Sequence, residues 1–173
     1  MTTTTIKIEG LEDLQRALER APAEANAALR TAMQRSTYRV QAEAQKRAPV
    51  DTGRLRASIT TGVSQTAEGI EGRVGSAVFY APYMEYGTGT QTDGTGGKGG
   101  RHWPPASALN VWARRHGFGD AGGYAGWVVA WKIGIRGGLK PRRYLRGALQ
   151  ASVKWVHDEF QAAVDRIVKD WGR

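Results

Sequence analysis

The amino-acid sequence predicts an α+β fold, in which a small antiparallel β-sheet packs against a long N-terminal helix and a long C-terminal helix. Two neighbouring segments rich in β-branched residues predict the sheet. Apolar residues recur every three or four positions from Tyr144 to Trp171, which is the strongest helical signal in the chain. Domains commonly have about 100–200 residues, so we expect residues 1–173 to form a single domain.

The N-terminal part is predicted to contain one strand and two helices. Thr3–Glu9 alternates β-branched and polar residues, as a short strand does. Leu11–Arg20 places its leucines on one helical face. Pro22 suits the first position of a second helix. That helix should run to about Ala48, because Pro49 disfavours helical geometry in the residue before it.

The middle of the chain is predicted to turn and then form a β-hairpin. The Asp-Thr-Gly sequence at 51–53 is typical of a tight turn. Leu55–Val63 and Ile70–Phe79 are rich in β-branched residues and are expected to pair as antiparallel strands. Tyr80–Gly87 is a compact aromatic segment, and Pro82 makes it unsuitable as a central strand.

A glycine-rich loop is expected at residues 88–101, within the stretch GTGTQTDGTGGKGG that begins at Gly87. A phosphate-binding loop requires the pattern G-x-x-x-x-G-K-[ST]. Thr92 occupies the position of the first glycine of that pattern, and Gly99 occupies the position of its final hydroxyl residue. The stretch is therefore interpreted as a flexible linker, or as a loop that becomes ordered when a partner binds.

An inserted helical pair is predicted within residues 104–138. The patterns indicate helices over about Ala106–His116 and about Tyr124–Arg136. On the first helix, Leu109 and Trp112 are expected to face inward. The large apolar residues of the second helix form one stripe: Tyr124, Val128, Trp131 and Ile135.

The chain has six tryptophans, and four of them belong to or adjoin this insertion. Tryptophan is enriched in interfaces as well as in cores. We expect Trp112 and Trp131 to lie in the core. Trp103, which follows the glycine-rich loop, is the better candidate for an interface.

The composition argues against several kinds of chemistry. The absence of cysteine excludes disulfides and thiolate metal sites. The three histidines lie in separate segments and lack the spacing of a metal-binding pair. A nucleophile elbow is absent, and the carboxylates show no paired spacing. We therefore predict that the protein is not an enzyme and has no catalytic, cofactor-binding or metal-binding residues.

The net charge of +9 favours an anionic partner or neighbour, such as nucleic acid. The N-terminus lacks the cationic and apolar regions of a signal peptide. The most apolar run, Trp127–Trp131, is much shorter than the roughly 20 residues of a membrane span. These features predict a soluble intracellular protein without a membrane partner.

Four segments together resemble one protein family: IKIEGLEDLQRALER near the N-terminus, APVDTGRLRASI at 48–59, FYAPYMEYGT at 79–88 and KPRRYLRGAL at 140–149. In this order and spacing, they resemble the small tail-component or neck proteins of long-tailed bacteriophages, which join head to tail or complete the tail. Many family members pass quickly from the third segment to the fourth. Here about fifty residues, Thr90–Leu139, intervene.

The resemblance implies a non-enzymatic virion protein of the phage neck, assembled in the host cytoplasm. Such proteins form homo-oligomeric rings between the capsid connector and the tail tube, and genomic DNA passes through them. A hexamer is favoured and a dodecamer comes second. The implied partners are head-completion or connector proteins on one side and tail terminator or tail-tube proteins on the other. The alternative, based on net charge, is a basic DNA-binding protein without sequence-specific readout.

Two sets of surface residues are predicted from the motifs and the charge distribution. The candidates for a subunit or partner interface are Tyr80, Tyr83, Glu85, Tyr86, Trp103, Arg142 and Arg143. The candidates for facing DNA are Lys132, Arg136, Lys140 and Arg146. The three tyrosines are spaced to share one face of a helix. That face either packs in the core or forms an interface. For the cationic residues, the alternative is that they form an ordinary solvated surface.

Overall fold

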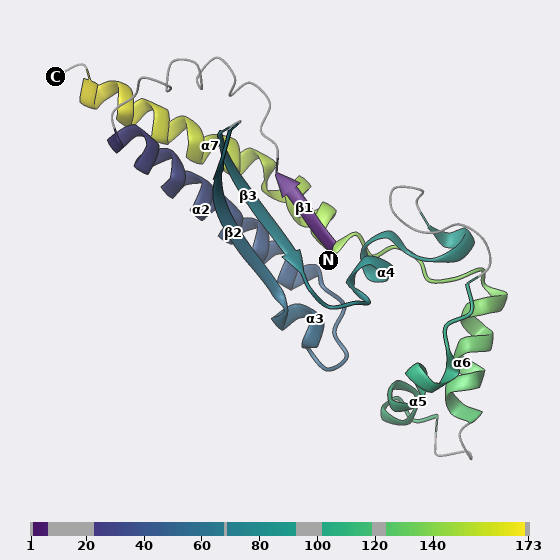
Figure 1. Ribbon diagram of the computed structural model, residues 1–173. Helices are drawn as coiled ribbons and strands as arrows, with labels where there is room; N and C mark the ends of the chain where they lie inside the picture. Colours follow the sequence, from purple (N-terminus) through teal and green to yellow (C-terminus); the bar gives the residue numbers. More distant parts are fainter. Residues whose placement is uncertain (1, 7–22, 68, 93–101, 119–123, 172–173) are drawn as a thin grey trace. The chain divides into compact units, whose positions relative to one another are not determined.

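The computed structural model describes residues 2–6, 23–67, 69–92, 102–118 and 124–171 (Figure 1). These residues form the predicted α+β fold, with an antiparallel sheet and long N-terminal and C-terminal helices. The chain divides into two compact units. Unit 1 comprises residues 1–48, 55–77 and 144–173, and unit 2 comprises residues 49–54 and 78–143. The single domain stays a prediction, because a compact unit does not necessarily fold alone.

Unit 1 contains a three-stranded antiparallel sheet. Its strands are β1 (Thr2–Ile6), β2 (Ile59–Thr66) and β3 (Gly69–Ser76). Strand β3 lies in the centre, so that Ser76 faces Thr2 on one side and Ile59 on the other. The hairpin of β2 and β3 is the one that the sequence predicts. The pairing of β1 with β3 joins residues about seventy positions apart.

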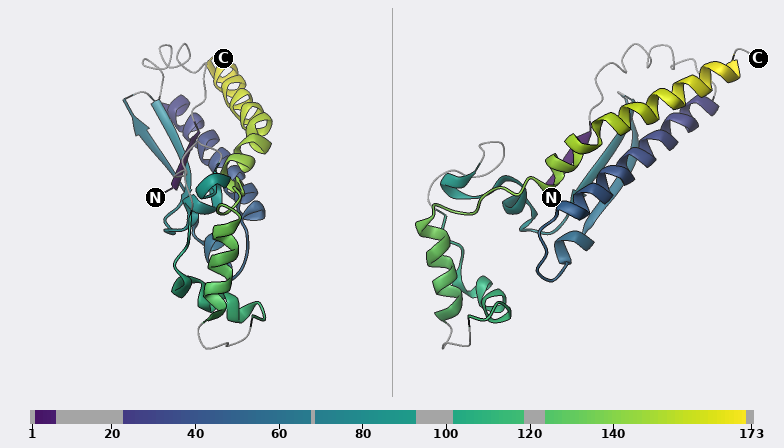
Figure 2. Two further views of the ribbon diagram at one scale, coloured as in Figure 1. Left: turned by 90° about the vertical axis from the view of Figure 1, so that its right-hand side faces the viewer. Right: turned by 180° about the vertical axis from the view of Figure 1, so that it is seen from behind.

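Two long helices complete unit 1: α2 (Ala23–Arg47) and α7 (Tyr144–Trp171). Helix α2 contacts both the sheet and α7 (Figure 2). The side chains that α2 buries are mostly small, which allows close packing. At Gly72 of β3, an added Cβ would come within 2.6 Å of both Met33 Sδ and Thr37 Cγ2, so the glycine allows α2 to approach the sheet.

The start of the hairpin differs from the sequence prediction. Residues 55–57 were expected in a strand but belong to a short helix, α3 (Arg54–Ala57), and β2 begins only at Ile59. The turn before α3 explains the difference. Gly53 adopts a φ of +79°, and the Arg54 amide donates a hydrogen bond to Thr52 Oγ1 at 3.4 Å. The turn therefore leads into a helix start rather than directly into the strand.

Two other predictions concern the end of β3 and the N-terminal segment before α2. Strand β3 ends at Ser76, and Phe79, which was expected at its end, is 77% exposed. The predicted helix at Leu11–Arg20 lies outside the described residues, as do residues 7–9 of the first predicted strand.

Unit 2 contains α4 (Ala81–Tyr86), the 3₁₀ turn η1 (Gly89–Gln91), α5 (Ala106–Arg115) and α6 (Tyr124–Ile135). Helices α5 and α6 are the predicted inserted pair, and they pack against each other. Gly126 marks their closest approach. Its amide donates to Asn110 Oδ1 at 3.0 Å, and a Cβ in its place would collide with the Ala106 carbonyl oxygen.

Candidate interaction surface on the inserted segment

The two ends of the inserted segment are held together by hydrogen bonds within unit 2. The Thr88 amide donates to Leu139 O at 2.9 Å, and the Leu139 amide donates to Thr88 Oγ1 at 2.9 Å. The Thr90 amide donates to Gly137 O at 2.8 Å. We call this ladder the clasp. It brings the end of the Tyr80–Thr88 motif beside the residues that precede the KPR motif.

The KPR motif itself also pairs with α4. The Arg142 amide donates to Met84 O at 2.7 Å, and the Arg143 amide donates to Glu85 O at 3.2 Å. Arg143 has a positive φ of 50°, which is uncommon for a residue with a side chain. Two motifs that are separated by about fifty residues in the sequence therefore form one local structure.

The clasp shows that the first residues of the glycine-rich loop are not a free linker. Gly89–Gln91 forms η1, and the Gln91 side chain donates to Arg136 O at 2.9 Å. The sequence interpretation of a flexible loop from residue 88 onward is wrong for this part. Residues 93–101 of the loop lie outside the described residues.

The predicted interface residues on and near α4 differ in exposure. Tyr80 and Tyr86 are half-buried, and Tyr83 is 45% exposed, with its ring centroid 6.0 Å from that of His102. Glu85 is buried, so its side chain is not part of the exposed surface. Arg142 and Arg143 are exposed.

Helix α6 buries its small residues and exposes its large ones. Its buried positions are Ala125, Gly126, Ala130 and Gly134. Its exposed positions include the predicted apolar stripe and also Trp127. The prediction that Trp131 belongs to the core is wrong, because 44% of its surface is exposed. The reason is close packing: α5 and Trp103 lie against the small face and leave no room there for large side chains.

The aromatic residues around α5 and α6 have three different environments. Trp127 and Trp131 stack on the exposed face of α6, with ring centroids 6.5 Å apart and an interplanar angle of 13°. Trp112 of α5 is half-buried and stacks on His116 at 4.1 Å. Trp103, predicted at an interface, is 49% exposed and covers Gly134. A hollow beside it is lined by Thr90, Trp103, Gly134, Ile135, Arg136 and Gly137.

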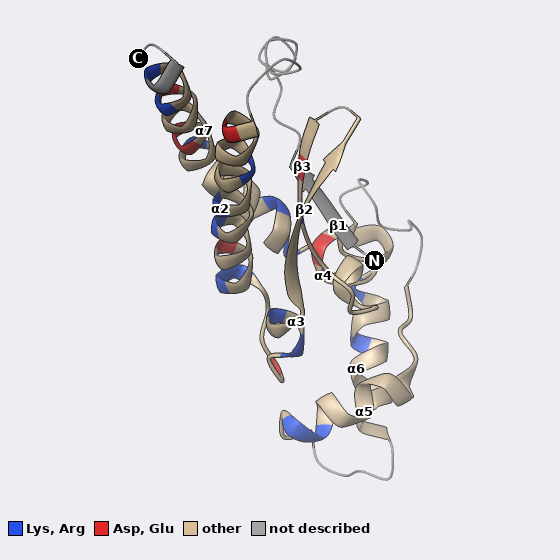
Figure 3. Cartoon of the chain, turned by 60° about the vertical axis from the view of Figure 1, so that its left-hand side comes forward, with Lys and Arg blue, Asp and Glu red and all other residues tan. Residues whose placement is uncertain are grey.

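The charge of the chain is concentrated in unit 2. This unit contains ten Lys and Arg residues and four Asp and Glu residues, a net charge of +6, whereas the larger unit 1 has a net charge of +3. Helices α5 and α6 contain cations but no carboxylate (Figure 3). Of the predicted DNA-facing residues, Lys132, Arg136 and Lys140 are exposed in unit 2, and Arg146 is half-buried in unit 1.

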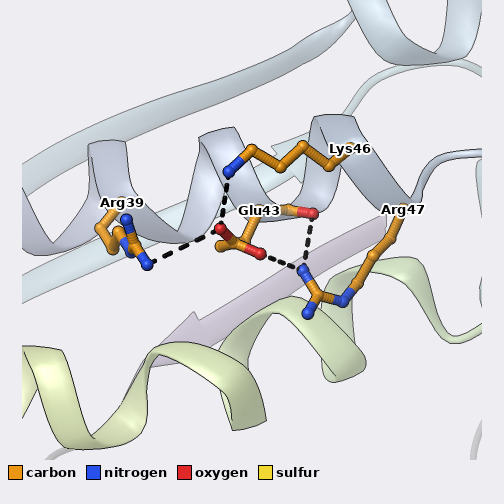
Figure 4. Close-up of polar contacts among 4 residues, drawn as sticks. All are labelled: Arg39, Glu43, Lys46 and Arg47. Atoms are coloured by element: carbon orange, nitrogen blue, oxygen red, sulfur yellow. Dashed lines mark hydrogen bonds and ion pairs between the residues drawn. The ribbon is translucent and has the colours of Figure 1, made fainter.

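Several cations of unit 1 contact carboxylates. Glu43 of α2 contacts Arg39, Lys46 and Arg47 (Figure 4). Hydrogen bonds from Arg47 and then from Lys46 lower the pKa of Glu43 from 4.5 to about 2. Arg35 of α2 also pairs with Glu159 of α7 at 2.9 Å. These contacts stabilise the scaffold rather than form a site.

The Asp-Thr-Gly turn makes a long-range ion pair that sequence reasoning did not find. Asp51 Oδ2 lies 3.5 Å from Arg115 Nη1 at the end of α5, within unit 2. No spacing rule connects two residues that are 64 positions apart, so only the fold reveals this pair.

Within the described part of the chain, no group of three His, Asp or Glu side chains is placed to hold a metal ion. The helices that the structure describes are all too short or too polar to cross a membrane.

These features define an α+β protein that carries a basic segment with an exposed aromatic face. Residues 12–87 match the family described as "Bacteriophage HK97-gp10, putative tail-component". The match confirms the resemblance to phage tail-component proteins that the motifs predict. It includes α2, the β2–β3 hairpin and α4, and it ends before the clasp and the inserted helices. No curated protein and no solved structure matches the chain.

Proposed function

We propose that the protein is a non-enzymatic structural component of the phage neck, which acts in head–tail joining or tail completion. The observation that carries the proposal is the family match over residues 12–87, which makes a phage tail component of the virion the best-supported class. In the proposed role, copies of the chain form a ring between the capsid connector and the tail tube, after assembly in the host cytoplasm. Head-completion or connector proteins contact one side, and tail terminator or tail-tube proteins contact the other.

The charge distribution supports passage of DNA through such a ring. Lys132, Arg136 and Lys140 are exposed in the unit that carries most of the net charge. Cations in a lumen attract phosphates without reading bases, which suits a passage for a whole genome. Arg146 completes this proposed DNA-facing set.

A closed ring requires that each subunit present two different surfaces, which meet head to tail. A hexamer is favoured and a dodecamer comes second. The proposed contacts with neighbouring subunits or partner rings are the exposed residues near the motifs: Tyr83, Trp103, Arg142 and Arg143, together with the half-buried Tyr80 and Tyr86.

Electron microscopy of purified virions tests the proposal. We expect a ring at the neck that is lost in particles made without this protein, and its symmetry will distinguish the hexamer from the dodecamer. If purified wild-type virions do not contain the protein, the proposal is refuted.

The alternative function is a basic DNA-binding protein without sequence-specific readout, and the net charge of +9 favours it. Titration of duplex DNA at several salt concentrations separates the two. A DNA-binding protein binds tightly when free, with a steep salt dependence. A subunit that surrounds DNA only after ring assembly binds weakly when free.

A further inference from the structure

The exposed face of α6 is a continuous apolar stripe that nothing in the proposed neck function explains. We define the α6 stripe as Tyr124, Trp127, Val128, Trp131 and Ile135. Their exposed fractions are 69%, 55%, 41%, 44% and 57%, respectively. Trp103, which is 49% exposed, extends the stripe at its C-terminal end, where it lines a hollow together with Ile135.

The size of this surface indicates an interface. An aromatic side chain has about 150–250 Å² of surface, so at these exposures the stripe and Trp103 leave on the order of 500 Å² uncovered. The largest apolar patch of a typical soluble monomer is about 300–600 Å² and is often functional, so a patch of this size is a candidate interaction site. Isolated exposed apolar residues need no such explanation, but six adjoining ones do.

The spacing of the stripe is that of a helix that packs lengthwise against another element. Its members lie at positions i, i+3, i+4, i+7 and i+11, as the anchors of a helix in a groove or a helix pair do. Trp127 and Trp131 stack on each other, which gives the middle of the stripe a broad and ordered surface.

The order of charges along α6 favours one occupant, a second copy of the same helix. Lys132 flanks the C-terminal half of the stripe, and Arg136 follows the end of the helix, whereas the first half, Tyr124–Val128, carries no charge. In an antiparallel pair of α6 helices, the cations of each copy lie beside Tyr124 and Trp127 of the other, where cation–π contacts form. In that orientation the two helix dipoles also point in opposite directions, which is electrostatically favourable.

Electrostatic repulsion between the α6 cations is lower in this arrangement than in a parallel one. Helix α6 has 12 residues and is therefore about 18 Å long. Antiparallel pairing about the middle of α6 separates the two Arg136 residues by roughly this length, which exceeds the Debye length of about 8–10 Å at physiological salt. The two Lys132 residues, nearer the middle, are closer, at about 7–8 Å along the axis. Parallel pairing would place Lys132 and Arg136 against their own counterparts, which is unfavourable.

We propose that the α6 stripe is a self-association surface, at which a second copy of the chain packs its own α6 antiparallel about a two-fold axis. Two such patches bury about 1,000 Å², which is near the lower limit for specific interfaces. The free protein is therefore a reversible dimer whose population depends on concentration. This two-fold contact belongs to the free protein and is distinct from the head-to-tail contact of a ring. Because Lys132 and Arg136 face DNA only after the dimer separates, either proposal can fail without the other.

Single-stranded nucleic acid is the competing occupant, because bases stack on exposed aromatic residues. A strand that follows the stripe would need cations along its whole length to match the phosphates. Here the cations gather at one end of the helix. The distribution therefore favours a second α6, and nucleic acid becomes an outcome of the test.

Analytical ultracentrifugation of the full chain tests the association. We expect a monomer–dimer equilibrium in the wild type. In the double variant Trp127→Ala/Trp131→Ala, the dissociation constant should rise roughly tenfold or more, as for central aromatic contacts in interfaces. Phe79→Ala is the matched control, because Phe79 is an aromatic residue of the same unit, is 77% exposed and lies outside the stripe. A wild-type protein that stays monomeric at all concentrations would overturn the proposal.

The absence of cysteine allows the orientation to be tested by site-specific crosslinking. Val128→Cys lies near the middle of the helix and should crosslink to itself through a short bis-maleimide. Tyr124→Cys should not crosslink to itself, but a mixture of Tyr124→Cys and Ile135→Cys should give a linked dimer. Strong self-crosslinking of Tyr124→Cys would contradict the antiparallel arrangement.

The competing occupant is tested with an oligothymidylate as the probe, by tryptophan fluorescence. We expect no saturable quenching that depends on Trp127 and Trp131. Such quenching in a protein that sediments as a monomer would overturn self-association in favour of single-stranded nucleic acid.

Discussion

Thr88 and Leu139 exchange two hydrogen bonds across an insertion of about fifty residues. The Thr88 amide donates to the Leu139 carbonyl, and the Leu139 amide donates to the Thr88 hydroxyl, each at 2.9 Å. The Thr88 residue is 3% exposed, so neither bond is easily replaced by water. Thr88 thus contributes two of the hydrogen bonds that close the base of the inserted helical pair.

Replacement of Thr88 by valine tests this closure. Valine keeps the shape but removes the acceptor, which leaves the Leu139 amide without its partner. We expect a loss of about 1–3 kcal/mol in the free energy of unfolding. Urea denaturation measures the loss, and hydrogen exchange should show faster exchange at the Leu139 amide. Thr90→Val is the control, because Thr90 is exposed and its hydroxyl makes only a 3.3 Å contact with Gly137 O, so it should change little.

A second prediction concerns Gly138, which has a φ of +131° and faces the Thr88 carbonyl. Alanine at this position would collide with that backbone oxygen and strain the chain, so we expect a destabilisation of about 2–4 kcal/mol. Gly117→Ala serves as a comparison for a positive φ without a collision. Gly117 also has a positive φ, +79°, but open space around it, so alanine there should cost only about 1 kcal/mol. Equal losses in thermal unfolding of the two variants would refute the steric explanation.

The stability of unit 1 should depend on pH through Glu43. Its pKa falls from 4.5 to about 2 on folding, because Arg47 and Lys46 donate hydrogen bonds to the ionised form. A lowered pKa means that the contribution is complete above pH 4.5 and is lost as the pH falls toward 2. Glu43→Gln should therefore be less stable than the wild type at neutral pH. In denaturant titrations, the difference should shrink as the pH is lowered through this window, and a difference that is undiminished at pH 2 would exclude this cause.

The exposed cations of unit 2 should set the affinity of the protein for duplex DNA at low salt. Replacement of Lys132, Arg136 and Lys140 by alanine should weaken binding and reduce the slope of log K against log salt by up to about 3, since each phosphate contact contributes about 0.9. Lys154→Ala is the control, because Lys154 is exposed in unit 1 and paired with Asp158 at 3.0 Å. An unchanged slope in the triple variant would show that these cations do not face DNA.

The sequence by itself determined the local elements that depend on short-range patterns. The long helix beginning near Pro22 appears as Ala23–Arg47, and the inserted helices appear at Ala106–Arg115 and Tyr124–Ile135. Helical periodicity and proline boundaries act within a few residues, so one chain is sufficient to detect them. The motifs near Asp51 and Tyr86 likewise indicated the phage tail-component resemblance, which the match over residues 12–87 confirms.

Only the tertiary structure decided which face of α6 is buried. Its sequence is apolar on nearly all sides, so periodicity locates the stripe but not the direction in which it points. Contact with Ala106 O and Trp103 requires small residues, and the fold therefore buries Gly126 and Gly134 and exposes Trp131. The Thr88–Leu139 bonds depend on the fold for the same reason. Contacts between residues far apart in the chain arise from three-dimensional packing, and no local pattern encodes them.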